Sequence, residues 1–236
     1  MTKPLSGRLA LVTGASRGIG AATAEALAMA GAHVILTART TGGLEETEEH
    51  IHAARGAATI APLDLTEADG IARLANAIAG RWKQLDILVL NAAMLGTLSP
   101  VPHIDGGEFD RLMALNVQAN QRLIAAFDPM LRQGAHPRLI VLTSSVAAQP
   151  RAYWGAYGAS KAALETLALT YAEEVRNLSD IKVAIVDPGA TATTMRARAF
   201  PGEDPSTIKS PGAAGKAIVE LAISDFETGH RVRLQG

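Results

Sequence analysis

The sequence predicts an α/β fold with a doubly wound parallel sheet of about seven strands. Short apolar runs of about five residues recur along the chain, and most are apolar on both faces, as in parallel strands covered by helices on either side. Between these runs lie Ala- and Leu-rich segments whose charged residues recur at helical spacing. Strand and helix alternate almost to the end of the chain, which is typical of a sheet built from successive β-α-β units.

The expected strands follow one another at intervals that leave room for a helix or a loop. They are LALVT (9–13), HVILT (33–37), ATIAPL (58–63), DILVL (86–90), RLIVLT (138–143), KVAIV (182–186) and HRVRL (230–234). Clear helical segments include residues 21–32, 66–82 and 161–178. Because no repeat, low-complexity tract or linker divides the 236 residues, we expect residues 1–236 to form a single domain.

Composition and charge argue against several classes of protein. With 22 basic and 23 acidic residues the net charge is −1, so the charge balance favours neither nucleic acid nor an anionic membrane as a partner. Because there is no cysteine, disulfides, thiolate metal sites and cysteine nucleophiles are excluded. The amino-terminal stretch has no signal-peptide core, and the longest uncharged stretch, residues 87–104, is typical of a strand followed by a loop. We therefore expect a soluble cytoplasmic protein.

Two irregular segments interrupt the alternation of strands and helices. Residues 91–105 follow the fourth expected strand, and residues 187–211 follow the sixth. Both leave the carboxyl ends of strands, which is the edge where open α/β sheets bind ligands. The second segment is long and contains four prolines, as a mobile cover over a substrate site would.

The glycine-rich stretch TGASRGIG (13–20) joins the first expected strand to the first helix. Gly14, Gly18 and Gly20 allow a tight turn, a close approach of the backbone to a pyrophosphate, and close packing of helix on strand. The helix N-terminus adds unpaired N–H groups and a partial positive charge. An ordinary strand-to-helix turn is the alternative. Because the β-α-β pattern continues after it, we expect a Rossmann-type dinucleotide-binding fold.

The residues at the end of the second expected strand favour NADP(H), that is NADP or its reduced form NADPH, over NAD as the cofactor. An acidic residue there would hydrogen-bond the ribose hydroxyls of NAD, whereas arginine accommodates the additional phosphate of NADP. Here Ala38 occupies the expected position of the acid, Arg39 follows it, and Arg17 lies inside the glycine-rich turn. Two guanidinium groups can therefore reach one phosphate, with no carboxylate to repel it. In the alternative interpretation Arg39 is a solvated surface residue.

Three other polar residues have two interpretations each. Asp64, after the third expected strand, either accepts a hydrogen bond from the adenine amino group or caps a helix that begins near Thr66. His50 and His52 lie near several glutamates and would suit a metal ion. Their stretch, LEETEEHIHAAR (44–55), is more simply the solvated face of a helix, so we expect no bound metal.

Tyr157 and Lys161 in AYGASK (156–161) lie four positions apart and therefore on one face of a helix. A free tyrosine has a pKa of roughly 10 and is protonated at neutral pH. An ammonium group about 5 Å away, at an effective dielectric of about 20, favours the phenolate by roughly 3 kcal/mol, while burial has the opposite effect. We expect the net effect to bring the phenol towards neutrality, where it exchanges a proton with an alcohol or carbonyl oxygen. We expect the small Gly158, Ala159 and Ser160 to make room for cofactor and substrate.

A pair of serines ends the fifth expected strand. Ser144 and Ser145 in TSSVAA (143–148) are placed so that one hydroxyl would hold the reacting oxygen beside the phenol. The alternatives are strand-end capping for the serines and an ordinary amphipathic helix surface for Tyr157 and Lys161. Their combination with the glycine-rich turn favours an active site.

Along essentially its whole length the sequence resembles the classical short-chain dehydrogenase/reductase (SDR) family. The matching motifs are TGxxxGxG as TGASRGIG (13–20), YxxxK as YGASK (157–161) and a Pro-Gly turn with a downstream threonine as PGATAT (188–193). Ser145 matches the second serine of the family's paired-serine strand end, with Ser144 as the alternative. Asn116 matches the asparagine that, in the family, kinks its helix and holds a water linking the lysine to solvent. The sequence departs from the family at LNAA (90–93), where the family has NNAG.

The resemblance implies a role for each of these residues. By this likeness Lys161 also hydrogen-bonds the nicotinamide ribose, and the Pro188–Gly189 turn lies against the carboxamide with Thr191 or Thr193. The expected catalytic residues are Asn116, Ser145, Tyr157 and Lys161. The expected cofactor-binding residues are Gly14, Ser16, Arg17, Gly18, Ile19, Gly20, Arg39, Asp64, Leu65, Asn91, Ala92, Tyr157, Lys161, Pro188, Gly189, Thr191 and Thr193.

Four residues near these motifs could contact the substrate. Tyr153 and Trp154 precede the expected catalytic tyrosine and would line the substrate pocket or a subunit interface. Arg196 and Arg198 would bind an anionic substrate or remain solvated on the surface. The resemblance also implies a homodimer or homotetramer, packed through the helices that carry the expected catalytic residues.

The sequence thus predicts an NADP(H)-dependent oxidoreductase that interconverts the carbonyl and secondary alcohol forms of a small molecule. Hydride would pass between the nicotinamide and the substrate carbon while Tyr157 moves the proton. Ser145 would polarise the reacting oxygen, Lys161 would tune the phenol, and Asn116 would support the proton relay. The alternative is a non-catalytic dinucleotide-binding sensor or scaffold of the same fold, against which the intact Ser–Tyr–Lys set argues.

Overall fold

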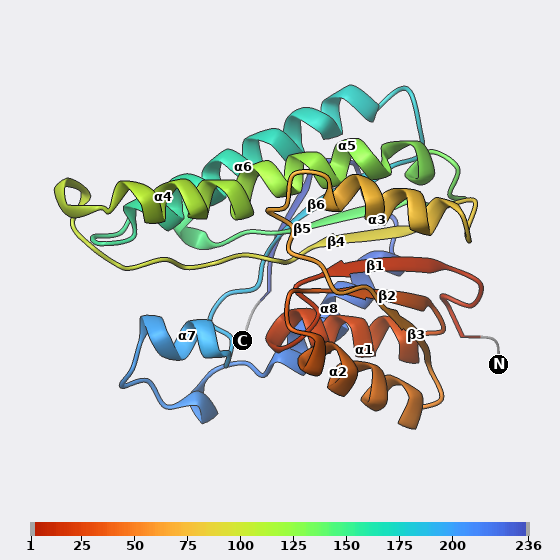
Figure 1. The fold of residues 1–236 in the computed structure, drawn as a ribbon, viewed down its shortest axis with the longest axis horizontal. Coiled ribbons are helices and arrows are strands. Elements are labelled where there is room, and N and C mark those ends of the chain that lie inside the picture. Colours follow the sequence, from red (N-terminus) through yellow and green to blue (C-terminus); the bar gives the residue numbers. More distant parts are fainter. Residues whose placement is uncertain (1–2, 235–236) are drawn as a thin grey trace.

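All seven strands of the sheet run parallel, in the order β3-β2-β1-β4-β5-β6-β7, in the computed structural model, which describes residues 3–234 (Figure 1). The strands are β1 (Leu9–Thr13), β2 (His33–Thr37), β3 (Ala57–Ile60), β4 (Ile87–Leu90), β5 (Arg138–Leu142), β6 (Lys182–Asp187) and β7 (His230–Arg233). The strand order reverses between β1 and β4, which is the switch point where sheets of this kind bind ligands. The predicted fold class is confirmed.

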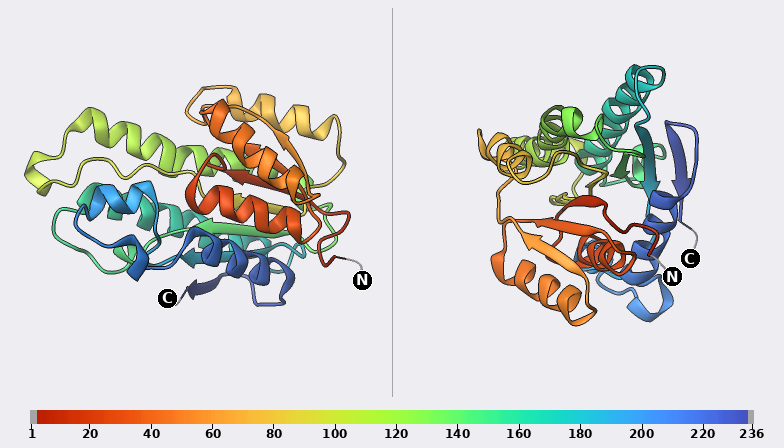
Figure 2. Two further views of the ribbon diagram at one scale, coloured as in Figure 1. Left: turned by 90° about the horizontal axis from the view of Figure 1, so that it is seen from below. Right: turned by 90° about the vertical axis from the view of Figure 1, so that its right-hand side faces the viewer.

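Two layers of helices cover the sheet, one on each face (Figures 1 and 2). One layer consists of α3 (Gly70–Ala79), α5 (Ala119–Leu131) and α6 (Gly155–Val175), and the other of α1 (Gly18–Met29), α2 (Thr41–Ala53) and α8 (Pro211–Ile223). Successive strand residues enter opposite cores: Leu11 and Ile35 pack under the first layer, whereas Val12 and Leu36 pack under the second. This double burial explains why the strands are apolar on both faces. Among the described residues, no helix has the length and apolar character needed to cross a membrane.

The third strand is shorter than predicted. It ends at Ile60 instead of residue 63. Pro62 has no N–H to donate, which interrupts the ladder, although the Leu63 N–H still donates to the Ala38 carbonyl at 3.0 Å. Because the apolar composition continues past Ile60, the sequence pattern does not show where the hydrogen-bonded pairing of β3 ends.

The helix after the third strand begins later than predicted, at Gly70 and not near Thr66. Asp64 causes the delay, because its Oδ1 accepts hydrogen bonds from the Thr66 backbone N–H at 2.9 Å and from the Thr66 hydroxyl at 2.6 Å. These bonds hold a turn ahead of the helix. The interpretation of Asp64 as the cap of this helix is therefore wrong.

Both irregular segments leave the carboxyl edge of the sheet, as predicted. The first leads into α4 (Gly106–Met113), and the second contains the short α7 (Thr194–Ala199), which projects at the same end of the molecule (Figure 1). The second segment is closed at its base, because Thr191 pairs with Lys209 in an isolated parallel bridge. The Lys209 ammonium also donates to the Pro188 carbonyl at 3.0 Å and to the Leu234 carbonyl at 2.6 Å.

Candidate active site

The turn between β1 and α1 has the backbone geometry of a phosphate cradle. Gly14 and Gly18 have φ angles of +66° and +59°, which favour glycine. A Cβ atom on Gly20 would lie 2.2 Å from the Gly14 carbonyl oxygen and 2.5 Å from Asn91 Nδ2, so α1 packs on the turn only without a side chain there. The Asn91 amide donates to the Thr13 carbonyl at 2.8 Å and to the Gly14 carbonyl at 3.3 Å. These contacts leave a turn that fits the pyrophosphate of a dinucleotide.

The other predicted residues of this turn differ in exposure. Arg17 is exposed at the N-cap of α1, Ser16 is partly buried, and Ile19 packs against the core under α1. Leu65 lies in the core on the opposite face of the sheet, so its side chain is not available to a ligand. Ala92 sits against the turn, with its Cα 3.0 Å from where a Gly14 Cβ would be.

The departure LNAA at residues 90–93 has a simple structural basis. Leu90 is the last residue of β4, and its side chain is buried in the core under α3, α5 and α6. Asn91, which the sequence keeps, holds the loop to the glycine-rich turn through its backbone as well, since its N–H donates to the Thr13 hydroxyl at 3.0 Å.

Arg39 follows β2, as predicted, and its side chain is 70 % exposed. Its Nη1 lies 3.8 Å from Asp64 Oδ2, so the expectation that no carboxylate is near this guanidinium is wrong. The Thr66 hydroxyl is the main reason that the pKa of Asp64 lies below its ordinary value. The sequence concealed this pair because the two residues follow neighbouring strands, β2 and β3.

A cleft of about 500 Å³ opens between the glycine-rich turn and the segment of residues 187–211. Gly18, Thr193 and Phe200 are among its lining residues. Thr193 caps α7, its hydroxyl oxygen accepting from the Arg196 N–H at 3.1 Å, and its methyl group would lie 3.4 Å from a Cβ on Gly18. Thr191 is instead buried, with 3 % exposed, and its hydroxyl donates to the Pro188 carbonyl at 3.3 Å. Of the two threonines left open by the sequence, Thr193 is the one at the cleft.

Tyr157 and Lys161 lie on one face of α6 and are both buried, with 7 % and 2 % of their surface exposed. The Lys161 ammonium lies 5.8 Å from the centre of the Tyr157 ring and donates to the Leu142 carbonyl at the end of β5, at 2.8 Å. The sequence predicted this approach of the two side chains. Burial lowers the pKa of Lys161 to about 8, while the charge of Glu165 acts in the opposite direction.

The expected downward shift of the tyrosine pKa is wrong for the chain itself. Burial raises the pKa of Tyr157 well above its ordinary value, and the Asp187 carboxylate adds to the increase. The ammonium of Lys161 does not overcome these two effects, because burial penalises the phenolate more than a cation near the ring face stabilises it. Tyr157 therefore holds its proton firmly and is an acid in this state of the protein.

The small residues between Tyr157 and Lys161 make room for protein rather than for a ligand. A Cβ on Gly158 would lie 3.0 Å from the Val146 carbonyl oxygen, so this glycine lets the turn after β5 approach α6. Ser160 is fully buried, and its hydroxyl donates to the Tyr157 carbonyl at 2.8 Å. Ala159 is exposed on the outer side of the helix. The predicted function of these residues is thus corrected.

Asn116 lies in a π-helical turn (Ala114–Gln118) between α4 and α5, where the resemblance implies a kink. It is fully buried, and its amide Nδ2 donates to the Met94 carbonyl at 2.9 Å and to Ser160 Oγ at 3.0 Å. Its Oδ1 accepts from the Met94 N–H at 2.9 Å. Asn116 thereby ties the loop after β4 to the helix of Tyr157. Its backbone carbonyl accepts from Asn120 Nδ2 at 2.9 Å.

Ser144 and Ser145 follow β5 and are both partly buried, with Ser145 at the start of a 3₁₀ turn (Ser145–Ala147). Ser144 stands at the N-cap of this turn and makes no side-chain capping bond there. Capping therefore does not explain Ser144. The turn packs against α6 at Gly158, which brings the serines close to the helix of Tyr157.

An aromatic group that the sequence only partly revealed flanks Tyr157. The Trp154 ring lies edge-on to Tyr157, with centroids 6.0 Å apart, and tilted against Phe200 of the 187–211 segment at 5.7 Å. Arg196 lies 3.7 Å over the Phe200 ring and forms an ion pair of 2.5 Å with Glu203. Phe200 could have been noticed as the single aromatic residue of residues 187–211.

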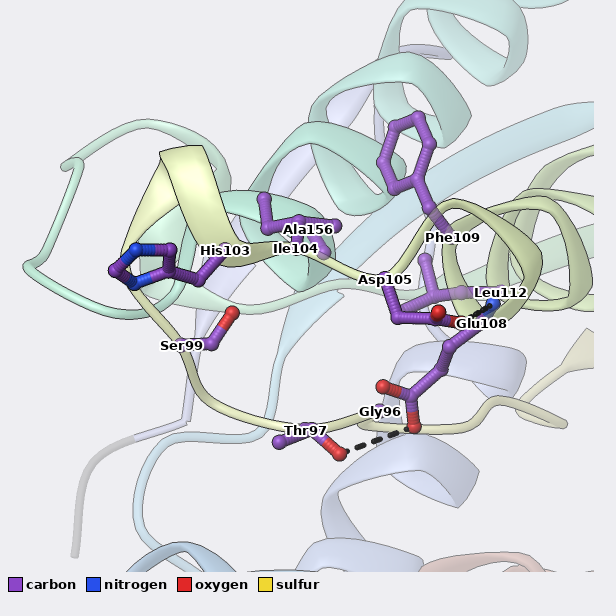
Figure 3. A pocket seen from close by; sticks show the side chains of 10 residues that line it. All are labelled: Gly96, Thr97, Ser99, His103, Ile104, Asp105, Glu108, Phe109, Leu112 and Ala156. Carbon is purple, nitrogen blue, oxygen red and sulfur yellow. Dashed lines mark hydrogen bonds between the residues drawn. The ribbon is translucent and has the colours of Figure 1, made fainter.

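A second hollow, of about 120 Å³, lies between residues 96–105, α4 and the first turn of α6, and Figure 3 shows its lining. Glu108 accepts from the Thr97 hydroxyl at 3.2 Å, and its own N–H donates to the Asp105 carboxylate at 2.7 Å. No residue predicted to bind cofactor or to act in catalysis lines this hollow. Tyr153 lies outside both cavities, with 60 % of its side chain exposed and a positive φ of 73°.

The two histidines considered as metal ligands lie in the last turn of α2. His50 Nδ1 is 3.2 Å from Glu25 Oε1, and both side chains are substantially exposed. Within residues 3–234 there is no group of three or more His, Cys, Asp or Glu side chains suited to a metal ion.

Comparison with known proteins agrees with the fold. A family model of short chain dehydrogenases matches residues 8–204. The uncharacterised oxidoreductase YciK of Escherichia coli K12 is 37 % identical over 210 residues, which cover 88 % of this chain and 82 % of YciK. A short chain dehydrogenase structure from Pseudomonas syringae superposes with a TM-score of 0.95 at 35 % identity, covering 100 % of this chain and 97 % of the other. One from Escherichia coli CFT073, complexed with NADPH, has a TM-score of 0.92 at 35 % identity, with 99 % and 98 % covered.

The fold and site therefore define an oxidoreductase of the Rossmann type that binds a nicotinamide dinucleotide. The chain belongs to the short-chain dehydrogenase/reductase family.

Proposed function

We propose that the protein is an NADP(H)-dependent oxidoreductase that interconverts a carbonyl and a secondary alcohol. The observation that carries this proposal is the buried pair of Tyr157 and Lys161 at the carboxyl edge of the sheet, in a chain whose glycine-rich turn fits a pyrophosphate. A binding protein has no use for a protonated phenol and an ammonium held together out of water.

The side chains of this site divide the work on the substrate oxygen. When bound, the nicotinamide supplies or accepts the hydride. Tyr157 holds a proton on its phenol oxygen, from which it delivers it to a carbonyl oxygen. Ser145 is the candidate to hold that oxygen, and Lys161 places a positive charge beside the phenol. Asn116 positions the helix of Tyr157 through its bond to Ser160.

The preference for NADP rests on two exposed arginines, Arg17 at the N-cap of α1 and Arg39 after β2. The pair of Arg39 with Asp64 is long and solvated, so it contributes little and leaves the guanidinium free to bind a phosphate. Two related dehydrogenases from Shigella flexneri and Escherichia coli were solved with NADP and NADPH. This agrees with the charge at the strand end.

Arg39→Ala is expected to weaken NADPH binding by about tenfold and to leave NADH binding unchanged, because a charge-assisted bond to phosphate contributes about 1.5 kcal/mol. Titration of both nucleotides with the wild type and the variant measures this change. Arg73→Ala is the matched control, since Arg73 of α3 is a similarly exposed arginine that pairs with Glu67. Tighter binding of NADH than of NADPH by the wild type would contradict the proposal.

The substrate side of the site is aromatic, and two arginines lie over the Phe200 ring, Arg196 at 3.7 Å and Arg151 at 5.2 Å from its centre. Trp154 and Phe200 form a wall next to the phenol, and Arg196 is held by Glu203. Arg196 is therefore a poor candidate for binding an anionic substrate, whereas Arg198 is exposed on α7. We expect aromatic and other apolar aldehydes or ketones to be better substrates than carboxylated ones.

NADPH oxidation over a broad panel of aldehydes and ketones tests the function. Turnover of at least one member, lost in Tyr157→Phe, supports the proposal. Binding of NADPH without turnover across the panel would instead favour the sensor or scaffold of the same fold. Alcohol oxidation with NADP⁺ is measured in parallel, because the same pair of side chains serves both directions.

We further infer one domain, a cytoplasmic location and a homodimer or homotetramer packed through α5 and α6. The exposed Ala159 and Leu167 on α6 agree with a contact through this helix. Light scattering coupled to size-exclusion chromatography tests the assembly, and a monomer at micromolar concentration would refute it.

A further inference from the structure

Glu165 is a buried carboxylate that the proposed chemistry does not use. It lies on α6 four residues after Lys161, and its side chain is 8 % exposed. Both of its oxygens are occupied by other groups. Oε1 accepts from the Thr143 hydroxyl at 2.5 Å, and Oε2 accepts from Arg231 Nη1 at 2.5 Å.

Lys161 is kept apart from this carboxylate by the end of β5. A Lys and a Glu four residues apart on a helix ordinarily attract one another. Within the described residues, however, Lys161 forms no ion pair, and its ammonium donates to the Leu142 carbonyl. Two successive residues thus bind the two side chains. The Leu142 carbonyl accepts from the Lys161 ammonium, and the Thr143 hydroxyl donates to the Glu165 carboxylate.

The third member, Arg231, comes from β7, the edge strand of the sheet. It pairs in register with Ile185 of β6, and its side chain is 53 % exposed. Without its charge, Glu165 would be a buried and unneutralised carboxylate one helical turn from Lys161. Such a carboxylate would attract the ammonium and favour its protonated form.

We propose that Arg231 and Glu165 are a positioning pair that holds Lys161 available for the nucleotide and for Tyr157, so that the last strand of the sheet sets the protonation of the catalytic lysine. This inference rests on the proposed function only in treating Lys161 as a catalytic residue. The pairing of Arg231 with Glu165 and its effect on the protonation of Lys161 do not depend on that function.

The other charged groups near Glu165 and Arg231 have partners of their own. Asp187, at the end of β6, lies 3.5 Å from Arg233 and accepts from the Gly189 N–H at 2.9 Å. Lys209 approaches from the 187–211 segment, where it donates to backbone carbonyls. Tyr157 is the remaining titratable group on the Lys161 face of α6. None of these contacts includes Glu165 or Arg231, so substitutions at this pair leave them in place.

Titration of Lys161 by NMR, in the full-length chain labelled with ¹³C at lysine Cε, tests the proposal. The chain has six lysines, and the resonance of Lys161 is identified by its loss in Lys161→Met. In Arg231→Gln we expect the pKa of Lys161 to rise by about one unit, because the charge of Glu165 is no longer neutralised. In Glu165→Gln we expect it to fall, because an attractive charge is removed.

The double variant Arg231→Gln/Glu165→Gln separates an indirect effect from a direct one. If Arg231 acts through Glu165, the double variant titrates like Glu165→Gln, and the upward shift of the single arginine variant disappears. Arg231→Lys should restore the wild-type titration, since it keeps the charge. Arg176→Gln is the matched control: Arg176 pairs with Glu173 on the same helix, and its loss should leave Lys161 unchanged.

An unchanged Lys161 titration in folded Arg231→Gln would overturn the proposal, and so would a further rise in the double variant. Circular dichroism verifies folding; where Arg231→Gln is unstable, the expected fall of the Lys161 pKa in Glu165→Gln is the test, and an unchanged titration there also overturns the proposal. The functional consequence is a shift of the pH profile of alcohol oxidation towards alkaline pH in Arg231→Gln. Loss of turnover in Tyr157→Phe is measured separately, so a failure of the proposed function is distinguishable from a failure of this inference.

Discussion

Tyr157→Phe is expected to lower turnover of any carbonyl substrate by at least about 100-fold, because general acid–base catalysis contributes this much or more. The substitution removes the phenol oxygen and keeps the ring, so the edge-on contact with Trp154 at 6.0 Å is preserved. We therefore expect NADPH affinity to change by less than about threefold, or 0.7 kcal/mol. Steady-state kinetics on the panel substrates and nucleotide titration measure the two quantities.

Tyr171→Phe is the matched control for this experiment. Tyr171 is also a largely buried tyrosine of α6, and its hydroxyl donates to Asp128 at 2.6 Å, away from the cleft. Loss of this bond should reduce stability by about 1 kcal/mol and leave turnover unchanged. Full activity of Tyr157→Phe, or equal losses in both variants, would remove Tyr157 from its assigned role.

Lys161→Met is expected to abolish turnover and, at neutral pH, to make the protein more stable. The fold lowers the pKa of Lys161 from 10.5 to about 8, which means that burial penalises the charged form. A pKa shift of that size destabilises the folded wild type at neutral pH by about 3 kcal/mol, and Lys161→Met removes this penalty. The variant loses about 1–2 kcal/mol of that gain, because the Leu142 carbonyl is left without its donor. The net gain in unfolding free energy is therefore about 1–2 kcal/mol, measured by urea denaturation.

The stability difference should shrink as the pH rises. The pKa of Lys161 is lower in the folded wild type than in the unfolded chain. Between about pH 8 and pH 10.5 the unfolded chain therefore binds more protons than the folded protein, and the unfolding free energy of the wild type increases as the pH rises. Lys161→Met lacks this gain of about 3 kcal/mol, so the two unfolding free energies converge as the pH rises and then cross, and the wild type is the more stable by about 1–2 kcal/mol above about pH 10.5. Lys216→Met, at an exposed position of α8, is the control and should show no such convergence. A difference that does not depend on pH would contradict the assigned cause.

Strand positions were predictable because burial on both faces leaves a clear apolar signature, as in Leu11 and Val12, which enter opposite cores. The pattern was less informative where hydrogen bonding ends before the apolar composition does. Pro62 illustrates this, because only its missing N–H marks the end of β3. Similarly, the Asp64 side chain delayed a helix whose composition would have allowed an earlier start.

Local spacing brought Tyr157 and Lys161 together correctly, since four residues fix two side chains on one face of a helix. The direction of the Tyr157 pKa could not be predicted, because it depends on burial and on Asp187 from another strand. Glu165 could have been noticed by the same spacing from Lys161. Its partner Arg231, which is 66 residues away, could not, because sheet order alone brings it near.

The contact between Trp154 and Phe200 allows the fluorescence of Trp154 to report on the position of residues 187–211. The only other tryptophan, Trp82, packs against Arg81 and against His33, the first residue of β2, and therefore lies at the amino edge of the sheet, opposite the cleft. Departure of residues 187–211 from α6 would expose one indole to water and leave the second unaltered. In a Trp82→Phe background, a red shift of the emission would register each such opening while a ligand enters or leaves.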